Sequence, residues 1–300
     1  MRSYARYVWS VVLLSGMSVG QAVATEPGVA KEDVTFENAG VTLAGTLYRP
    51  EHPVAAVVLV HGSGQEKRMA GFASRLADQG IAALTYDKRG VGESGGRYVG
   101  PEVGSNNVDA GNLGLLAADA NAAVGALQKH LPGTHGPVGL LGYSQAGWVI
   151  PIAAERNPAV TFMVLFSGPV ATAREQLRFQ FYTESKPTFW DSHTEADARK
   201  HIAEDKDRYQ FADTDPREAL GKLSIRGLWV YGGKDVQAPV QLSIERLDAL
   251  DASGKRYEHR LYPTLAHNTA FAKSDEGKEA VQAAVQWIRS VANEPSPTKH

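Results

Sequence analysis

Cysteine is absent from this sequence of 300 residues. Its absence excludes a disulfide framework, a zinc or iron–sulfur site held by thiolates, and a cysteine nucleophile. The H-E-x-x-H motif of zinc proteases and the G-x-x-x-x-G-K-[ST] phosphate-binding loop are missing as well. Any chemistry of this chain must therefore come from oxygen and nitrogen side chains, and we expect neither a metal nor an organic cofactor.

A surplus of basic residues is also missing. The chain has 31 Lys and Arg against 33 Asp and Glu, a formal net charge of −2, whereas a nucleic-acid binder typically carries a basic excess. After the first 24 residues, no segment approaches the length of about 20 apolar residues that a membrane-spanning helix needs. The composition predicts a globular protein without a nucleic-acid partner. We expect no membrane span in the chain that follows residue 24.

The first residues have the pattern of a secretory signal peptide. Arg2 and Arg6 precede the apolar run Val8–Val19, and small residues end at Ala24. This order of charge, apolar run and small residues predicts cleavage after Ala24. The apolar run is too short for a membrane anchor, and there is no cysteine that a lipid could modify. We therefore expect residues 1–24 to be removed and the mature protein to be exported, either periplasmic or secreted.

Strand and helix patterns alternate along the chain. An antiparallel hairpin comes first, because turn-forming residues 37–40 join two strand patterns. This order predicts an α/β fold with a mostly parallel, doubly wound sheet behind an N-terminal antiparallel hairpin. The expected strands are Val34–Phe36, Val41–Tyr48, Val54–Val60, Ile81–Tyr86, Val138–Leu141, Val160–Phe166, Leu228–Tyr231 and Tyr257–Tyr262. The expected helices are residues 66–79, Leu113–Leu131, a helix that ends at Glu155, Val240–Leu250 and Glu276–Val291.

One interval, residues 170–222, interrupts this alternation. It has no convincing strand pattern, and its polar sequence with scattered aromatic residues is typical of helices. We expect a helical insertion that stands over the C-terminal edge of the sheet. Residues 25–300 would then form a single domain that carries this insertion.

A serine lies at the apex of a predicted strand-to-helix turn. In the segment VGLLGYSQAG, residues 138–147, Ser144 is flanked by the small residues Gly142 and Ala146. A nucleophile on such a turn needs small neighbours because the strand and the helix pass closely. The pattern G-x-S-x-A differs from G-x-S-x-G by one methyl group and has little specificity alone. Its place between a strand and a helix nevertheless favours Ser144 as a nucleophile.

A serine hydroxyl needs a base to take its proton and an acid to hold that base. In this architecture the order along the chain is serine, acid, histidine. Asp235 follows the predicted strand Leu228–Tyr231, whereas residues 167–169 after the preceding strand offer no carboxylate. Of the nine histidines, only His267 lies at the C-terminal end of a strand downstream of Asp235. We predict Asp235 as the acid and His267 as the base, although a turn aspartate and a surface histidine are the ordinary alternatives.

A glycine-rich loop follows the first buried strand. Its sequence, HGSG at residues 61–64, can bring backbone N–H groups to a developing oxyanion. We predict the N–H groups of Ser63 and of Gln145, the residue after the nucleophile, as the two donors of an oxyanion hole. His61 is expected to brace the loop by hydrogen bonding. The alternative is a plain turn before a helix.

Five segments together resemble the α/β-hydrolase superfamily. The chain is similar to bacterial serine hydrolases of that superfamily that are described as esterases, lipase-like hydrolases or serine aminopeptidase-like hydrolases, from about Val34 to Val291. The resemblance implies that Ser144, Asp235 and His267 form a catalytic triad and that residues 170–222 are a cap that shapes the acyl pocket. The five segments are HGSG at 61–64, YDKRGVGES at 86–94, GYSQAGW at 142–148, GGKDVQAP at 232–239, and His267.

The second of these segments contains G-x-G-x-x-G at residues 90–95. A dinucleotide site would require a helix to open directly from these glycines, but the chain continues as a loop. The resemblance implies instead a structural D-x-R-G-x-G-x-S turn, in which we expect Asp87 and Arg89 to pair.

Aromatic and acidic residues recur in the insertion. The aromatic side chains can line an apolar substrate pocket or dock the insertion on the domain, and both alternatives stay open. The acidic side chains Glu184, Glu195 and Glu204 can recognise the amino terminus of a peptide or form a solvated face. The aromatic residues are Phe179, Phe181, Tyr182, Phe189, Trp190, Tyr209 and Phe211.

Three functions follow from this pattern. The first is an exported serine hydrolase that cleaves carboxylic esters through Ser144, His267 and Asp235 and an acyl-enzyme intermediate. The second is a serine peptidase or amidase on the same triad, with a short peptide as the substrate. The third is a binding protein without catalysis on a hydrolase fold, which would need a broken triad or oxyanion loop, and neither is broken in this sequence.

Overall fold

The computed structural model describes residues 28–100, 105–133, 136–206 and 210–294. The predicted signal peptide, residues 1–24, lies outside these ranges, as does Tyr209. Within the described ranges, no helix combines the length and the apolar character that crossing a bilayer requires.

The strands of the described chain form one sheet of eight, in the order β1-β2-β4-β3-β5-β6-β7-β8. Strands β1 and β2 form the predicted antiparallel hairpin, and β2 also pairs antiparallel with β4. The pairings from β4 through β3 to β8 are all parallel. The predicted fold class is therefore confirmed. The strands are β1 (Ala30–Asn38), β2 (Val41–Arg49), β3 (Ala55–Val60), β4 (Ile81–Tyr86), β5 (Val138–Tyr143), β6 (Phe162–Phe166), β7 (Arg226–Gly232) and β8 (Tyr257–Tyr262).

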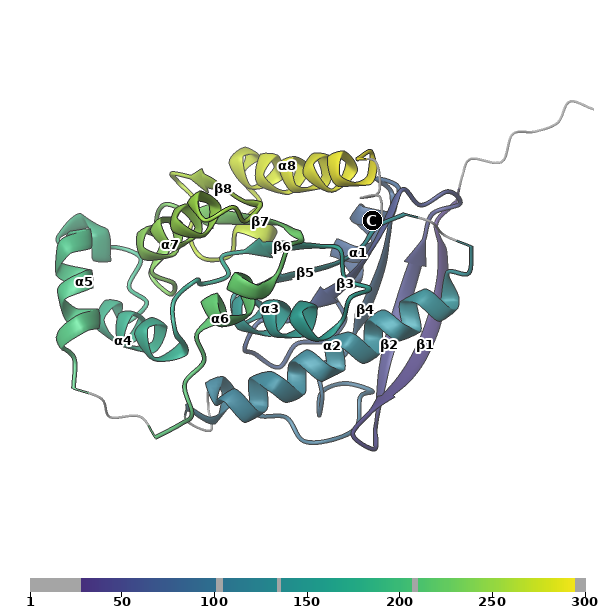
Figure 1. Ribbon diagram of the computed structural model, residues 1–300, viewed down its shortest axis with the longest axis horizontal. Coiled ribbons are helices and arrows are strands. Elements are labelled where there is room, and N and C mark those ends of the chain that lie inside the picture. The colour runs from purple at the N-terminus through teal and green to yellow at the C-terminus, as the bar shows by residue number, and fades with distance from the viewer. Residues whose placement is uncertain (1–27, 101–104, 134–135, 207–209, 295–300) are drawn as a thin grey trace, which may run out of the picture.

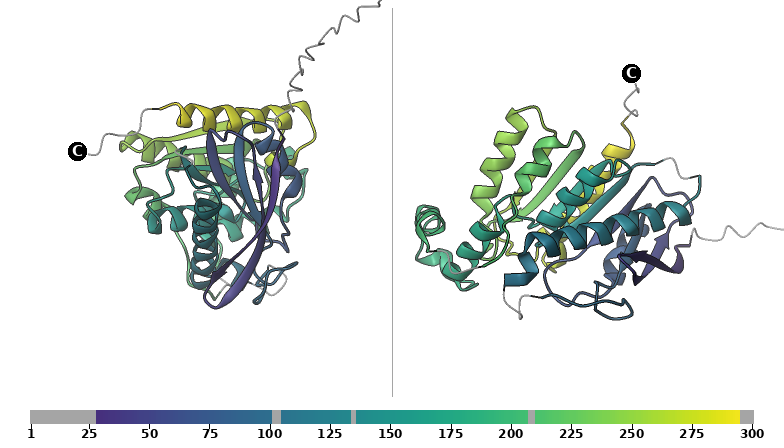
Figure 2. Two further views of the ribbon diagram at one scale, coloured as in Figure 1. Left: turned by 90° about the vertical axis from the view of Figure 1, so that its right-hand side faces the viewer. Right: turned by 60° about the horizontal axis from the view of Figure 1, so that its bottom comes forward.

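Helices cover both faces of this sheet. Figure 1 and Figure 2 show α8 on one side and α2 on the other. Alternation along β3 explains the two layers, because Val57 faces the core under α1 and α8, whereas Val58 faces the core under α2 and α3. The helices that flank the sheet are α1 (Ala70–Ala77), α2 (Ala110–His130), α3 (Ala146–Arg156), α7 (Val240–Ala252) and α8 (Asp275–Ala292).

The predicted helix over residues 66–79 is wrong at its start, since α1 begins only at Ala70. The backbone N–H of Arg68 donates to Asp87 Oδ1 at 2.8 Å, and that of Met69 donates to Thr85 Oγ1 at 2.8 Å. These two donors are committed to side chains near the end of β4. Side chains at the end of β4 thus hold residues 68 and 69, and α1 begins directly after them.

The expected pairing of Asp87 with Arg89 is also wrong. Asp87 Oδ2 accepts from Arg68 Nη2 at 3.1 Å, whereas Arg89 Nε donates to Asp119 Oδ2 on α2 at 2.9 Å. Arg68 reaches Asp87 from the segment before α1, whereas Asp119 lies on α2, which covers the other face of the sheet. The aspartate and the arginine of the D-x-R-G-x-G-x-S segment therefore find separate partners.

The described part of the insertion at residues 170–222 contains helices joined by turns and no strand, as predicted. It contains α4 (Ala173–Thr183), the short 3-10 helix η3 (Phe189–Asp191), α5 (Glu195–Glu204) and α6 (Pro216–Lys222). Figure 1 shows α4 and α5 together at one end of the molecule. Phe179 packs with Ala198 and Ile202 in a small core between α4 and α5. By contrast, Leu220 of α6 belongs to the main core.

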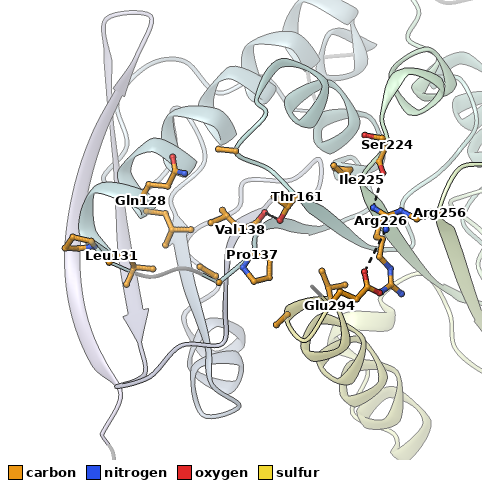
Figure 3. Close-up of a pocket in the computed structure, with 18 residues that line it drawn as sticks. Gln128, Leu131, Pro137, Val138, Thr161, Ser224, Ile225, Arg226, Arg256 and Glu294 are labelled. Carbon is orange, nitrogen blue, oxygen red and sulfur yellow. Dashed lines mark hydrogen bonds and ion pairs between the residues drawn. The ribbon is translucent and has the colours of Figure 1, made fainter. Parts of the chain in front are cut away.

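A cavity of about 710 Å³ lies at the amino ends of the parallel strands (Figure 3). Its lining includes Val138 and Arg226, the first residues of β5 and β7. Ligands of open α/β sheets bind at the opposite, carboxyl ends of the strands. A functional site is therefore expected at those ends.

Candidate active site

Ser144 occupies a sharp turn between β5 and α3. Its backbone φ is 52°, in the left-handed region that residues other than glycine rarely adopt. The turn is closed by the N–H of Gly147, which donates to the carbonyl of Ser144 at 2.8 Å. A Cβ at Gly142 would lie 2.6 Å from Ala146 Cβ and 2.6 Å from the carbonyl oxygen of Val60. The small residues of the G-x-S-x-A pattern are therefore required by the close approach of strand and helix.

The three predicted triad residues meet at the carboxyl ends of the strands. His267 Nε2 lies 2.9 Å from Ser144 Oγ, and His267 Nδ1 lies 2.8 Å from Asp235 Oδ2. The other carboxylate oxygen of Asp235 accepts the backbone N–H groups of Gln237 at 2.7 Å and Ala238 at 2.9 Å. Because an ionised carboxylate only accepts hydrogen bonds, Nδ1 carries the ring proton of a neutral His267. Nε2 is then left to accept the proton of the serine hydroxyl.

Backbone contacts hold the histidine loop in place. Ser167, the residue after β6, donates its hydroxyl to the carbonyl of His267 and lies 3.1 Å from Thr269 Oγ1. The sequence offers no carboxylate at this position, and the structure gives Ser167 the different task of fixing the base. The position after β6 thus supports the histidine, while the acid comes from the position after β7.

The residues predicted for the oxyanion hole lie beside Ser144. Ser63 and Gln145 line the same cavity as Ser144, which has a volume of about 730 Å³. Gln145 directly precedes the first residue of α3, so its N–H belongs to the unpaired N-terminal donors of that helix. The carbonyl of Ser63 accepts from Tyr98 Oη at 3.1 Å. The arrangement can place two backbone donors and a nucleophile around one carbonyl group.

The insertion supplies the opposite wall of this cavity. Leu177, Phe181 and Glu184 line it from α4 and its C-terminal end. Phe181 has 59% of its surface exposed, whereas Phe179 two residues earlier is fully buried inside the insertion. The aromatic residues therefore divide between the two alternatives, because one lines the pocket and another packs the insertion together. Of the three acidic residues, Glu184 is the one that reaches the cavity wall.

Side chains of the insertion also hold the loop that carries Asp235. Trp190 Nε1 donates to the carbonyl of Asp235 at 2.9 Å, and Gln176 Nε2 donates to the carbonyl of Gln237 at 2.6 Å. Thr183 Oγ1 donates to the carbonyl of Val236. The sequence marks Trp190 only as an aromatic residue and gives no sign of the roles of Gln176 and Thr183, because no local pattern links them to Asp235. The insertion and the acid loop consequently form one hydrogen-bonded unit.

His61 braces the oxyanion loop, as predicted. Its ring Nε2 lies 2.6 Å from the carbonyl oxygen of Tyr86, and the side chain is buried. Burial, assisted by the positive charge of Lys88, lowers the pKa of His61 from 6.5 to about 3, although the Tyr86 carbonyl and Asp87 act in the other direction. His61 is therefore neutral in the folded protein down to about pH 3.

This lowered pKa predicts a loss of stability in acid. The unfolded chain protonates His61 below about pH 6.5 while the folded chain does not, so stability falls as the pH drops from about 6.5 towards 3. At pH 4.5 the contribution is roughly 2–3 kcal/mol. Urea unfolding at pH 7 and pH 4.5 should show a smaller drop in His61→Gln, which cannot titrate, than in the unaltered protein. Equal drops in both proteins would contradict the assignment.

In the described ranges, no group of three or more histidine and carboxylate side chains is arranged to hold a metal ion.

Comparisons with known proteins agree with this geometry at the level of the family. Residues 51–226 match the family model of the serine aminopeptidases, S33. A stretch of 69 residues is 39% identical to the quorum-quenching protein AidA of Acinetobacter baumannii, and it covers 22% of this chain and 23% of that relative. The chain thus spans less than a quarter of the length of this curated relative.

Three solved structures share the fold. An esterase of Pyrococcus furiosus has a TM-score of 0.63 and 16% identity, covering 88% of this chain and 92% of its own. A putative dienelactone hydrolase of Klebsiella pneumoniae has a TM-score of 0.61 and 17% identity, covering 87% and 98%. An acylaminoacyl peptidase of Pyrococcus horikoshii has a TM-score of 0.65 and 14% identity, covering 92% of this chain and 44% of that longer chain.

At these identities the structures establish the fold and leave the substrate open. The family model covers more than half of the chain, and its span includes the serine turn. The protein belongs to the serine aminopeptidase S33 family and has the fold that these solved α/β-hydrolase structures share.

Proposed function

We propose that this protein is an exported serine hydrolase that cleaves carboxylic esters through an acyl-enzyme intermediate. The observation that carries the proposal is the chain of hydrogen bonds from Ser144 through His267 to Asp235, which opens onto a cavity of about 730 Å³. Nucleophile, base and orienting acid within hydrogen-bond distance of one another are the arrangement that serine hydrolysis needs.

In the first half of the reaction, Ser144 Oγ attacks the ester carbonyl while His267 Nε2 takes its proton. Asp235 holds the ring in the required tautomer and stabilises the imidazolium that forms. The negative oxygen of the tetrahedral intermediate receives hydrogen bonds from the N–H groups of Ser63 and Gln145. Collapse of the intermediate releases the alcohol, which takes the proton from His267.

In the second half, water attacks the acyl-enzyme with His267 as the base. The same backbone donors stabilise the second tetrahedral intermediate. Its collapse returns the proton to Ser144 and releases the carboxylic acid. Leu177 and Phe181 of the insertion line the cavity, and their side chains would select the substrate.

A peptidase or amidase activity on the same triad is the second candidate. The name of the matching family and the likeness to an acylaminoacyl peptidase favour it. The carboxylate of Glu184 at the cavity wall is a group that can meet the amino terminus of a peptide. We place ester cleavage first, because an alkoxide is a better leaving group than an amide anion and the cavity wall contributed by α4 also contains apolar side chains.

We test the function on protein recovered from the periplasm of a bacterial host, where a mature N-terminus at Thr25 would support export.

A fluorophosphonate probe should modify Ser144, as mass spectrometry of the peptides will show. The same preparation should hydrolyse p-nitrophenyl esters from acetate to longer acyl chains. Turnover of aminoacyl anilides at a rate equal to or above that of the esters would favour the peptidase. If the probe does not label Ser144 in folded protein, the result would favour the third hypothesis, a binding protein without catalysis.

A further inference from the structure

A buried lysine lies directly beneath the predicted oxyanion hole. Lys88 follows the end of β4 by two residues, and only 2% of its surface is exposed. Its ammonium group donates to the carbonyl of Gly62 at 2.6 Å, to Oε1 of Gln145 at 3.0 Å and to the carbonyl of Gly64 at 3.4 Å. Three acceptors match the three N–H donors of an ammonium group. Burying a cation is costly unless it is held in this way, so the position calls for a function.

The first of these contacts determines where the N–H of Ser63 points. Gly62 and Ser63 share one planar peptide unit, and in a trans peptide the C=O and the N–H point in opposite directions. Because Lys88 holds the carbonyl of Gly62, the N–H of Ser63 is directed away from the lysine. Ser63 lines the cavity of Ser144, so an N–H directed away from the lysine is compatible with the role of an oxyanion donor.

The second contact reaches the other predicted donor. Gln145 carries the second N–H of the oxyanion hole, and its buried side chain is fixed at both ends of the amide. Oε1 accepts from Lys88 at 3.0 Å, and Nε2 donates to the carbonyl of Asn107 at 2.7 Å. One ammonium group therefore contacts both backbone segments that supply the donors.

The sheet order explains how a single side chain can do this. Strand β3 lies between β4 and β5, so the loop after β3, which contains Gly62, lies between Lys88 and Gln145. Packing leaves that loop little freedom, because a Cβ at Gly62 would lie 2.8 Å from Tyr143 Cε2. Lys88 thus ties together the carboxyl ends of three neighbouring strands.

We propose that Lys88 is a positioning residue of the oxyanion hole, which holds the Gly62–Ser63 peptide and Gln145 so that their backbone N–H groups converge on the substrate oxygen. The inference rests on the function proposed above. Donors that are oriented before the reaction need no reorganisation when the negative charge develops. The benefit belongs to the transition state and not to the bound substrate. Loss of Lys88 should therefore lower kcat and leave KM nearly unchanged.

The test compares Lys88→Met with Lys67→Met, a matched control at an exposed lysine in the segment that follows the same loop. We measure kcat and KM for a p-nitrophenyl ester, and the affinity for a trifluoromethyl ketone, whose adduct with serine carries an oxyanion. In Lys88→Met, kcat and the affinity for the ketone should both fall by about 10- to 100-fold, somewhat less than the loss of one oxyanion donor. Lys67→Met should match the unaltered protein.

Each outcome decides the question. Unchanged kcat and unchanged ketone affinity in a folded Lys88→Met overturn the proposal, and so does a loss that appears only in KM. If Lys88→Met does not fold, Gln145→Met removes the side-chain partner while keeping the backbone donor. A fall in ketone affinity in that variant then supports the proposal, and an unchanged affinity overturns it. Lack of ester hydrolysis and of probe labelling in the unaltered protein would instead refute the proposed function itself.

Discussion

Replacing Ser144 with alanine is expected to lower kcat/KM for p-nitrophenyl acetate by about 10⁵- to 10⁶-fold, because the nucleophile of a triad acts as a unit with its base. His267 and Asp235 remain in place but have no hydroxyl to activate. The residual rate should come from substrate binding and the oxyanion donors alone. The measurement is steady-state hydrolysis with equal amounts of folded protein.

The control for this prediction is Ser253→Ala, which removes an exposed hydroxyl at the end of α7. Its activity should equal that of the unaltered protein, which guards against an effect of purification or of a contaminating esterase. If Ser144→Ala kept most of the activity, covalent catalysis at this serine would be refuted. If Ser144→Ala lost activity and its melting temperature also fell, the loss of activity would have to be assigned to folding.

Replacing Asp119 with alanine is expected to destabilise the protein by about 3–5 kcal/mol, because it leaves the buried cation of Arg89 without its partner. Only 1% of Asp119 and 6% of Arg89 is exposed. The two side chains meet in a fork, in which both Nε and Nη2 of Arg89 donate to the carboxylate. Bidentate pairs of this kind combine charge with fixed geometry.

The loss should be large because three elements meet at this pair. Asn38, at the end of β1, donates from its side chain to Asp119 Oδ1 at 2.7 Å and accepts from Arg89 through its carbonyl at 3.1 Å. The pair therefore joins the hairpin, the turn after β4 and helix α2. Removal of Asp119 therefore disrupts contacts on all three elements.

Urea unfolding monitored by circular dichroism checks this prediction. The double variant Arg89→Met with Asp119→Leu should regain much of the lost stability, since apolar residues of similar size can replace a buried ion pair. Glu245→Ala, which removes one partner of the exposed pair with Arg199, should cost less than about 1 kcal/mol. Similar losses in Asp119→Ala and Glu245→Ala would show that burial of the pair does not matter.

The insertion is connected both to the cavity beside Ser144 and to the loop that carries Asp235. Helix α4 lines the cavity on one side, and it is joined to the Asp235 loop by the hydrogen bonds of Gln176 and Thr183. Residues of the cavity wall are thus connected to the loop that carries Asp235. Under the proposed function, variation in the insertion is expected to change specificity and the position of Asp235 together.

Several features of the fold follow from local patterns. The hairpin, the continuous apolar strand over residues 55–60 and the order of strands and helices are visible because side-chain periodicity reports burial directly. Helix boundaries are less exact, and α2 begins at Ala110 instead of Leu113 because the side chain of Asp109 accepts the N–H of Gly111. A capping bond of this kind adds residues that have no periodic signal.

The sequence alone determined the α/β order of the elements and the candidate residues Ser144, Asp235 and His267. It could do so because parallel strands bring their carboxyl ends to one edge, so the place of a residue after its strand predicts its place in space. Only the tertiary structure decided that Arg89 pairs with Asp119 and that Lys88 reaches Gln145, 57 residues further along the chain. Such partners depend on the order of strands in the sheet and on the packing of α2 against it. Local periodicity records whether a residue is buried but carries no information about which distant side chain it meets.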